Sequence, residues 1–308
     1  MENTRAKTTR NSLILLLTAT IWGMAFVSQS KGMDYMHPFT FNGVRSLIGA
    51  AGILVYILIS RKIAGDKAAK LDWKLNVKAG LLCGIFLTIA STLQQFGIKY
   101  TSVGKAGFIT TLYIIFVPMF GVFLKKKVAP VVWAAAGMAA VGMYLLCMTE
   151  SLRLGAGDIM VFLCAIAFAI QIMTVDHYAA RIDGAVVSCI QFTVCGVVCC
   201  IGALIWGQPT FGQIQEGLGA LLYAGVLSCG VGYTLQIVGQ KGLNPTVAAL
   251  IMSLESVIAT ISGWIAYKIG FLSTDQTLTP RQIAGCIIVF AAVILVQLPP
   301  EWFRFGKK

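Results

Sequence analysis

Two ionisable residues lie deep within hydrophobic segments of the chain. Arg45 follows Pro38 by seven residues, and Glu255 follows Thr246 by nine. At a helical rise of about 1.5 Å per residue they would lie roughly 10 and 13 Å from opposite membrane surfaces, at levels about 6 Å apart. A charge at the bilayer centre costs at least about 2.5–3.5 kcal/mol, so it must face a partner or a wet cavity. Three alternatives stay open: a substrate-facing pair, a structural ion pair, and separate satisfaction by backbone and water.

Polar and aromatic side chains at similar depths extend this candidate site. Glutamine amides within membrane segments can bind a substrate or another helix, and the Tyr113 hydroxyl needs a partner at its depth. Trp22 is the tryptophan at mid-segment, and Phe168 is its counterpart in the second half of the chain. The residues we predict to bind substrate are Trp22, Arg45, Gln94, Tyr113, Phe168, Gln191, Gln236 and Glu255.

Motifs for catalysis are absent from the sequence. Gly104-Lys105 lacks the first glycine of a nucleotide-binding loop, and neither an HExxH nor a GxSxG pattern occurs. The nine cysteines lie almost wholly within apolar segments and include no CxxC pair, which is typical of small core residues. We therefore predict no enzyme activity, no catalytic residues, no cofactor and no metal site. Glu255 is the acidic residue deepest in a segment and is our candidate for proton coupling.

The composition predicts a membrane protein with many spans. Hydrophobic residues make up 57% of the chain, charged residues 12%, and the mean hydropathy is +0.82. Soluble domains have roughly 45–50% apolar and about 25% charged residues. We expect an all-α polytopic membrane protein with ten transmembrane helices, at 12–30, 38–60, 79–98, 106–124, 129–149, 156–176, 185–206, 217–238, 246–268 and 280–298.

The distribution of positive charge predicts the orientation. Most lysines and arginines fall in the loops on the side of the N-terminus, so both termini should be cytoplasmic in a multi-pass protein of the cell membrane. The net charge of +12 is concentrated in these short loops, where contact with anionic membrane lipid accounts for it. We expect no nucleic acid among the partners, and a homodimer stays open.

An internal duplication divides the chain into two halves. The pattern Thr-Leu-Gln-x-x-Gly-x-Lys begins at Thr92 and again at Thr234, 142 residues later. A second offset of 146 residues relates Trp22 to Phe168 and Arg45 to Gln191. With five predicted spans each, residues 1–149 and 150–308 would insert with opposite orientations. Two inverted five-helix repeats are typical of secondary transporters, whose site lies where the repeats meet.

Ordered motifs in both halves resemble a known family. The first half contains Trp22-Gly23-x-x-Phe26, Pro38, Arg45, Lys99-Tyr100-Thr101-Ser102 and the run Gly104–Tyr113 leading to Val117-Pro118. The second contains Asn244-Pro245-Thr246, Ser253-Leu254-Glu255 and Leu278-Thr279 with Gln282 and Gly285. The set is similar to the EamA-type family of the drug/metabolite transporter superfamily.

The resemblance implies ten helices in two inverted repeats, cytoplasmic termini and a central cavity that moves small metabolites. These are often amino acids or related compounds, commonly moved outward. The chain departs from the family pattern at Ser256, where the family usually has proline. We expect a metabolite exporter that works by alternating access, with the small molecule and membrane lipid as its partners. A non-transporting membrane scaffold or a lipid-handling protein is the alternative.

Overall fold

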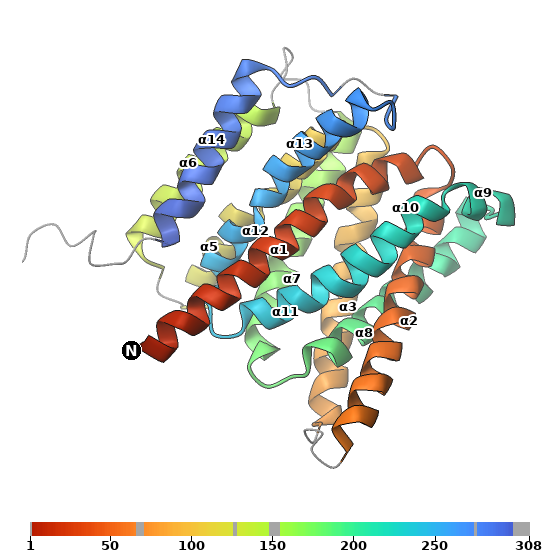
Figure 1. Ribbon diagram of the computed structural model, residues 1–308, viewed down its shortest axis with the longest axis horizontal. Helices are drawn as coiled ribbons and strands as arrows, with labels where there is room; N and C mark the ends of the chain where they lie inside the picture. Colours follow the sequence, from red (N-terminus) through yellow and green to blue (C-terminus); the bar gives the residue numbers. More distant parts are fainter. Residues whose placement is uncertain (1, 66–70, 126–127, 148–154, 274–275, 298–308) are drawn as a thin grey trace, which may run out of the picture.

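The computed structural model describes residues 2–65, 71–125, 128–147, 155–273 and 276–297 (Figure 1). These residues form helices and connecting turns, with no strand among them. The helices of the first half are α1 (Glu2–Gly32), α2 (Pro38–Ala64), α3 (Trp73–Ile98), α4 (Val103–Thr111), α5 (Tyr113–Phe123) and α6 (Pro130–Cys147). Those of the second half are α7 (Ala156–Ala179), α8 (Gly184–Gly202), η2 (Ala203–Gly207), α9 (Phe211–Glu216), α10 (Leu218–Leu222), η3 (Tyr223–Gly232), α11 (Tyr233–Gln240), α12 (Pro245–Met252), α13 (Leu254–Lys268) and α14 (Pro280–Gln297).

Eight helical segments are long and apolar enough to cross a membrane, so the protein is an all-helical, multi-pass membrane protein. Four of them are built from consecutive elements: α4 with α5, α8 with η2, α10 through α11, and α12 with α13. Two further apolar helices correspond to predicted spans but are shorter over their described residues, 130–142 in α6 and 280–295 in α14. Each predicted span therefore coincides with a helical segment.

Prolines and capping side chains set the helix starts. Pro38 and Pro245 occupy the first turn of α2 and α12, where a missing N–H costs nothing. The Asp72 carboxylate accepts from the Leu75 N–H, and the Ser102 hydroxyl accepts from the Lys105 N–H. Such caps satisfy backbone donors that have no partner within the helix.

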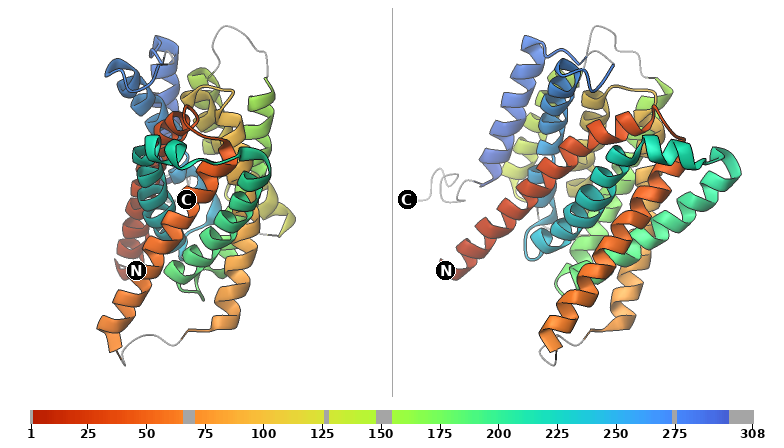
Figure 2. Two further views of the ribbon diagram at one scale, coloured as in Figure 1. Left: turned by 90° about the vertical axis from the view of Figure 1, so that its right-hand side faces the viewer. Right: turned by 45° about the vertical axis from the view of Figure 1, so that its right-hand side comes forward.

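The two halves of the chain interleave. α2 packs along α8, α3 along α7 and α14 along α6, so segments far apart in sequence lie side by side (Figures 1 and 2). Glycines allow the closest approaches. A Cβ at Gly97 would overlap the Val161 side chain and lie 2.8 Å from the Gly157 carbonyl oxygen, and one at Gly239 would lie 2.8 Å from Leu15. Small residues at such crossings let helix backbones approach closely.

Besides the π-helix η2 at the end of the α8 span, three segments within the spans depart from regular α-helix. The span of α4 and α5 breaks at Leu112, and the span of α12 and α13 breaks at Ser253. Pro118, whose ring removes one helical hydrogen bond, lies within α5, six residues after the break. The third segment is the π-helix η3, in which the Tyr233 N–H reaches back to the Ser228 carbonyl. All three departures lie beside the central cavity described below.

Substitution of Gly97 by alanine tests the α3–α7 crossing. The added methyl group would press on the Gly157 backbone, and overpacking typically costs about 1–3 kcal/mol. We expect Gly97→Ala to lower the thermal unfolding temperature of the detergent-purified protein. The matched control is Gly137→Ala in α6, where nothing lies within 4 Å of the new Cβ, so that this helix should keep or gain stability. Equal melting temperatures for the two variants would contradict the crossing.

Acidification tests the start of α2. His37 Nδ1 accepts from the Phe39 N–H at 3.4 Å, and burial, together with the Lys99 cation, lowers the pKa of His37 below 6.5. A lowered folded-state pKa means that the contribution to stability is complete above pH 6.5 and is lost as the pH falls through the folded-state value. We expect the melting temperature to fall below pH 6.5 in the wild type and less in His37→Asn, which keeps an acceptor. The same pH profile in both proteins would refute the role of His37.

Candidate functional site

A small central cavity lies among helices of both halves of the chain. Its volume is about 30 Å³, room for roughly one or two water molecules. Its walls are Trp22, Phe26, Gln29, Arg45, Ser46, Leu87, Ser91, Gln94, Thr110, Tyr113, Phe168, Gln171, Ile172, Phe192, Ser228, Cys229, Tyr233, Gln236 and Glu255. Metabolite sites occupy roughly 300–1,000 Å³, so this conformation is closed around a space too small for such a ligand.

The cavity brings together seven of the eight residues predicted from sequence. Trp22, Arg45, Gln94, Tyr113, Phe168, Gln236 and Glu255 all line it. Gln191 does not. It is fully buried on α8 with its Cα against Gly84 of α3, and its side-chain oxygen and nitrogen have no hydrogen-bond partner. The structure thus places Gln191 outside the cavity wall, in contrast to the prediction from sequence.

Glu255 is held by Tyr113. The Tyr113 hydroxyl donates to Glu255 Oε1 at 3.0 Å, and the two side chains are 2% and 3% exposed. Each residue lies directly after a helix break, Tyr113 after Leu112 and Glu255 in the first turn of α13 after Ser253. The breaks thus direct both side chains to the same point, which satisfies a carboxyl group that would otherwise be buried without a partner.

Arg45 remains without a carboxylate partner. It is 5% exposed on α2, its Nε has no hydrogen-bond partner, and its guanidinium carbon lies 5.4 Å from the centre of the Phe41 ring. Among the residues that the structure describes, the ion pairs are Lys31–Asp34 and Lys105–Asp158. The structural ion pair between Arg45 and Glu255, one of the three alternatives, is therefore not formed in this conformation.

Three of the four glutamines on the cavity wall have amide or hydroxyl partners, whereas Oε1 of the fourth, Gln29, is buried without a hydrogen-bond partner. Gln94 Nε2 donates to the Thr110 hydroxyl at 3.1 Å. Gln171 and Gln236 exchange amide hydrogen bonds at 3.3 and 3.5 Å. These bonds join α3 to α4 and α7 to α11. A substrate that engages these amides must therefore compete with contacts between helices.

Aromatic rings form one wall of the cavity, and sequence reasoning missed part of it. The Tyr233 ring lies 4.5 Å from Trp22 and 5.0 Å from Phe192, and the Trp22 indole N–H donates to the Ser228 carbonyl at 3.4 Å. Tyr233 directly precedes the second copy of the repeated octapeptide, and this position could have drawn attention to it. Ser46, Ser91 and Phe192 carried no signal of their own.

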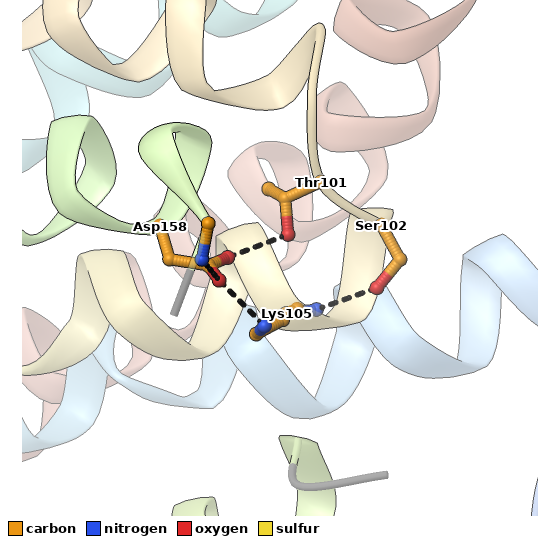
Figure 3. A network of polar contacts seen from close by, with 5 residues as sticks. Thr101, Ser102, Lys105 and Asp158 are labelled. Atoms are coloured by element: carbon orange, nitrogen blue, oxygen red, sulfur yellow. Dashed lines mark hydrogen bonds and ion pairs between the residues drawn. The ribbon is translucent and has the colours of Figure 1, made fainter. Parts of the chain in front are cut away.

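An ion pair between the half-buried Lys105 and the buried Asp158 joins two helices at one end of the bundle. Lys105 Nζ contacts Asp158 Oδ2 at 2.6 Å, and Asp158 also accepts from the Thr101 hydroxyl at 2.9 Å and the Gly155 N–H at 2.8 Å (Figure 3). The Asp158 side chain is 3% exposed. This network joins the start of α4 to the start of α7.

The opposite end is held by side-chain contacts to backbone carbonyls. Asn11 Nδ2 donates to the Lys241 carbonyl at 2.7 Å, which joins α1 to the end of α11. Lys241 Nζ donates to the Ile182 carbonyl at 3.2 Å. The two ends thus differ in the chemistry that holds them together.

A double-mutant cycle on Tyr113 and Glu255 tests their contact. A hydrogen bond to a charged group contributes about 1.5–3 kcal/mol, and coupled neighbours show interaction energies of about 0.5–3 kcal/mol. We expect Tyr113→Phe and Glu255→Gln each to change the melting temperature. The change in the double variant should differ from the sum of the two single changes. Tyr56→Phe, at an exposed tyrosine of α2, is the matched control. Strict additivity would show that the two side chains do not interact.

Comparison with known proteins gives a consistent result over nearly the whole chain. An uncharacterized transporter of Archaeoglobus fulgidus is 28% identical over 290 residues, covering 92% of this chain and 84% of the relative. The uncharacterized transporter YwfM of Bacillus subtilis is 24% identical and covers 94% of both chains.

A solved crystal structure shares the fold with a TM-score of 0.74 at 16% identity, covering 96% of this chain and 99% of the other. Residues 10–148 and 155–298 each match the EamA-like transporter family. The chain therefore belongs to the EamA-like transporter family and is a membrane transporter.

Proposed function

We propose that this transporter moves a small metabolite, amino-acid-like or a related compound, outward across the cell membrane by alternating access. In this proposal all ten helical segments span the membrane, as two inverted repeats at residues 1–149 and 150–308. The central cavity is the substrate site at the junction of the repeats. Both termini are cytoplasmic, in keeping with the excess of lysine and arginine in the loops on the N-terminal side.

The pairing of the cavity residues carries this proposal. An offset of 142 residues relates Leu87 to Cys229, Ser91 to Tyr233, Gln94 to Gln236 and Tyr113 to Glu255, and an offset of 146 relates Trp22 to Phe168, Phe26 to Ile172 and Ser46 to Phe192. Both members of these seven pairs line the cavity, whereas Arg45 lines it without its counterpart Gln191. Such a wall is what two repeats related by a two-fold axis through the cavity would produce.

Matched helix crossings support the same arrangement. Gly97 approaches Val161, and the residues at the corresponding offsets, Gly239 and Leu15, also approach each other. α3 thus meets α7 as α11 meets α1. Exchange of the two halves between equivalent conformations would open the cavity to each side in turn.

The closed cavity and its two different ends support alternating access. A space of about 30 Å³ excludes a metabolite, so transport requires rearrangement. Opening at one end would break the Lys105–Asp158 contact, and opening at the other would break the contact between Asn11 and the Lys241 carbonyl. The contact at the Lys105–Asp158 end is charge-assisted and the Asn11 contact is neutral, so the Lys105–Asp158 end should open less readily.

The cavity groups suit a substrate with a carboxylate, an amine and an apolar part. The Arg45 guanidinium has no carboxylate partner and can bind one from a substrate. Glu255 can exchange its bond from Tyr113 for one from an amine, and Trp22 with Tyr233 offers an aromatic surface. Binding at Glu255 would also couple proton release to transport.

Removal of the Arg45 charge tests the site. Loss of a charge-assisted hydrogen bond of about 1.5–3 kcal/mol corresponds to roughly 10–100-fold in rate or affinity. We expect Arg45→Gln to reduce transport by about that factor, and Arg45→Lys to reduce it less. The measurement is efflux from proteoliposomes loaded with an equimolar mixture of the standard amino acids, quantified by mass spectrometry.

Arg281→Gln is the matched control, because this arginine lies outside the cavity at the start of α14. A folded Arg45→Gln protein that transports at the wild-type rate would remove Arg45 from the site.

Thiol labelling separates transport from the scaffold alternative. In a background without native cysteines, Arg45→Cys should react with a water-soluble maleimide, whereas Ala135→Cys in the buried core should not. Equal protection of both would favour the scaffold.

A further inference from the structure

A second, larger cavity lies at the end of the bundle that carries Lys241. Its volume is about 630 Å³, and it is bounded by α2, the start of α3, the α7–α8 turn and α11. Figure 1 shows these elements around the lower part of the bundle, with the lower ends of α2 and α3 on the right. The cavity does not include any residue of the central cavity, so the central site does not account for it.

Three cations line this cavity, and none of them forms an ion pair with a carboxylate of the described residues. Arg61 is half-buried near the end of α2, and its guanidinium makes no hydrogen bond or ion pair within the described chain. Arg181 Nη2 donates to the His177 carbonyl at 3.3 Å, and Lys241 Nζ donates to the Ile182 carbonyl at 3.2 Å. All three therefore retain N–H donors for an anion.

The two carboxylates of the cavity are occupied as helix caps. Asp72 Oδ1 accepts from the Leu75 N–H at 3.0 Å, and Asp183 Oδ1 accepts from the N–H groups of Ala185 and Val186 at 3.0 and 3.2 Å. Asn76 ties the two caps together, since it donates to the Asp72 carbonyl at 2.8 Å and accepts from the Asp183 N–H at 2.9 Å. These bonds fix the start of α3 relative to the α7–α8 turn, and none of them involves the cations.

The cavity changes from charged to apolar with depth. Along α11 its wall runs from Lys241 through Val238 to Thr234, seven residues or roughly 10 Å. Tyr56 and Ile57 of α2 form the facing wall, and the neighbouring Leu54, Val55 and Leu58 are exposed on the outside of the bundle, where a membrane protein meets lipid. A ligand for this shape has an anionic head at the membrane surface and an apolar part below it.

We propose that this cavity binds the phosphate headgroup of an anionic phospholipid from the adjoining leaflet. Arg61, Arg181 and Lys241 contact the phosphate, and the apolar walls contact the glycerol and the first part of the acyl chains. Basic pockets between transmembrane helices recognise headgroups in this way. The lipid would join α2 to the end of α11, and so would stabilise the bundle in this conformation.

Thermal unfolding with added lipid tests this proposal on the full-length protein. The delipidated protein in neutral detergent is mixed with palmitoyl-oleoyl phosphatidylglycerol or with the phosphatidylcholine of the same acyl chains. We expect phosphatidylglycerol to raise the melting temperature by about 2–5 °C more than phosphatidylcholine. The difference should vanish in Arg61→Gln/Arg181→Gln and persist in Lys62→Gln/Lys74→Gln, which removes two exposed cations outside the cavity at the same end.

Three outcomes would contradict the proposal. Equal loss in both double variants would show general charge attraction and overturn the site. An equal shift with soluble glycerol 3-phosphate would assign the cavity to a free anion and overturn the lipid. Native mass spectrometry of the wild type in an equal mixture of the two lipids requires no substitution, and it should retain phosphatidylglycerol selectively. Retention of both lipids alike would contradict the proposal even if the variants fail to fold.

Discussion

Polar groups within a membrane protein must find partners inside the bundle, because the lipid offers none. This constraint explains why many of the charged, amide and hydroxyl side chains of the apolar spans lie together at one central cavity. Glu255 meets the Tyr113 hydroxyl, and Gln171 meets Gln236, each across a boundary between helices. These hydrogen bonds stabilise the helix packing, as do the close crossings at glycine, since a buried amide or carboxyl group without a partner costs several kcal/mol.

Where the constraint is not met, the exceptions are informative. Arg45 Nε and both polar atoms of the Gln191 side chain are buried without hydrogen-bond partners. The two residues correspond to each other under the 146-residue offset. Arg45 lies on α2 and Gln191 on α8, and these helices pack along one another. Polar groups without partners at equivalent places in the two halves indicate hydrogen bonds that this conformation does not form. A bound substrate or a different conformation can supply them.

Much of the fold could be predicted from sequence because the strongest signals are local. Runs of apolar residues, and prolines such as Pro38 and Pro245 at helix starts, locate the helical segments, although α1 begins ten residues and α3 six residues before the predicted spans. The breaks at Leu112 and Ser253 could not be predicted, since neither residue is a helix breaker and the helix geometry there depends on tertiary contacts. The same limit applied to the site. Depth along a helix identified Arg45, Tyr113 and Glu255, but the face that Gln191 or Tyr233 presents depends on how α8 and α11 pack, which no local pattern records.

The π-helix η3 has a consequence for the shape of the cavity. Its wider turns hold Ser228 where its carbonyl accepts from both the Tyr233 N–H and the Trp22 indole. The winding of these ten residues also sets the rotation of α11, which follows directly. If one turn tightened to α-helical winding, Tyr233 and Gln236 would swing about the axis of α11 together. One polar and one aromatic wall of the site therefore depend together on the winding of η3.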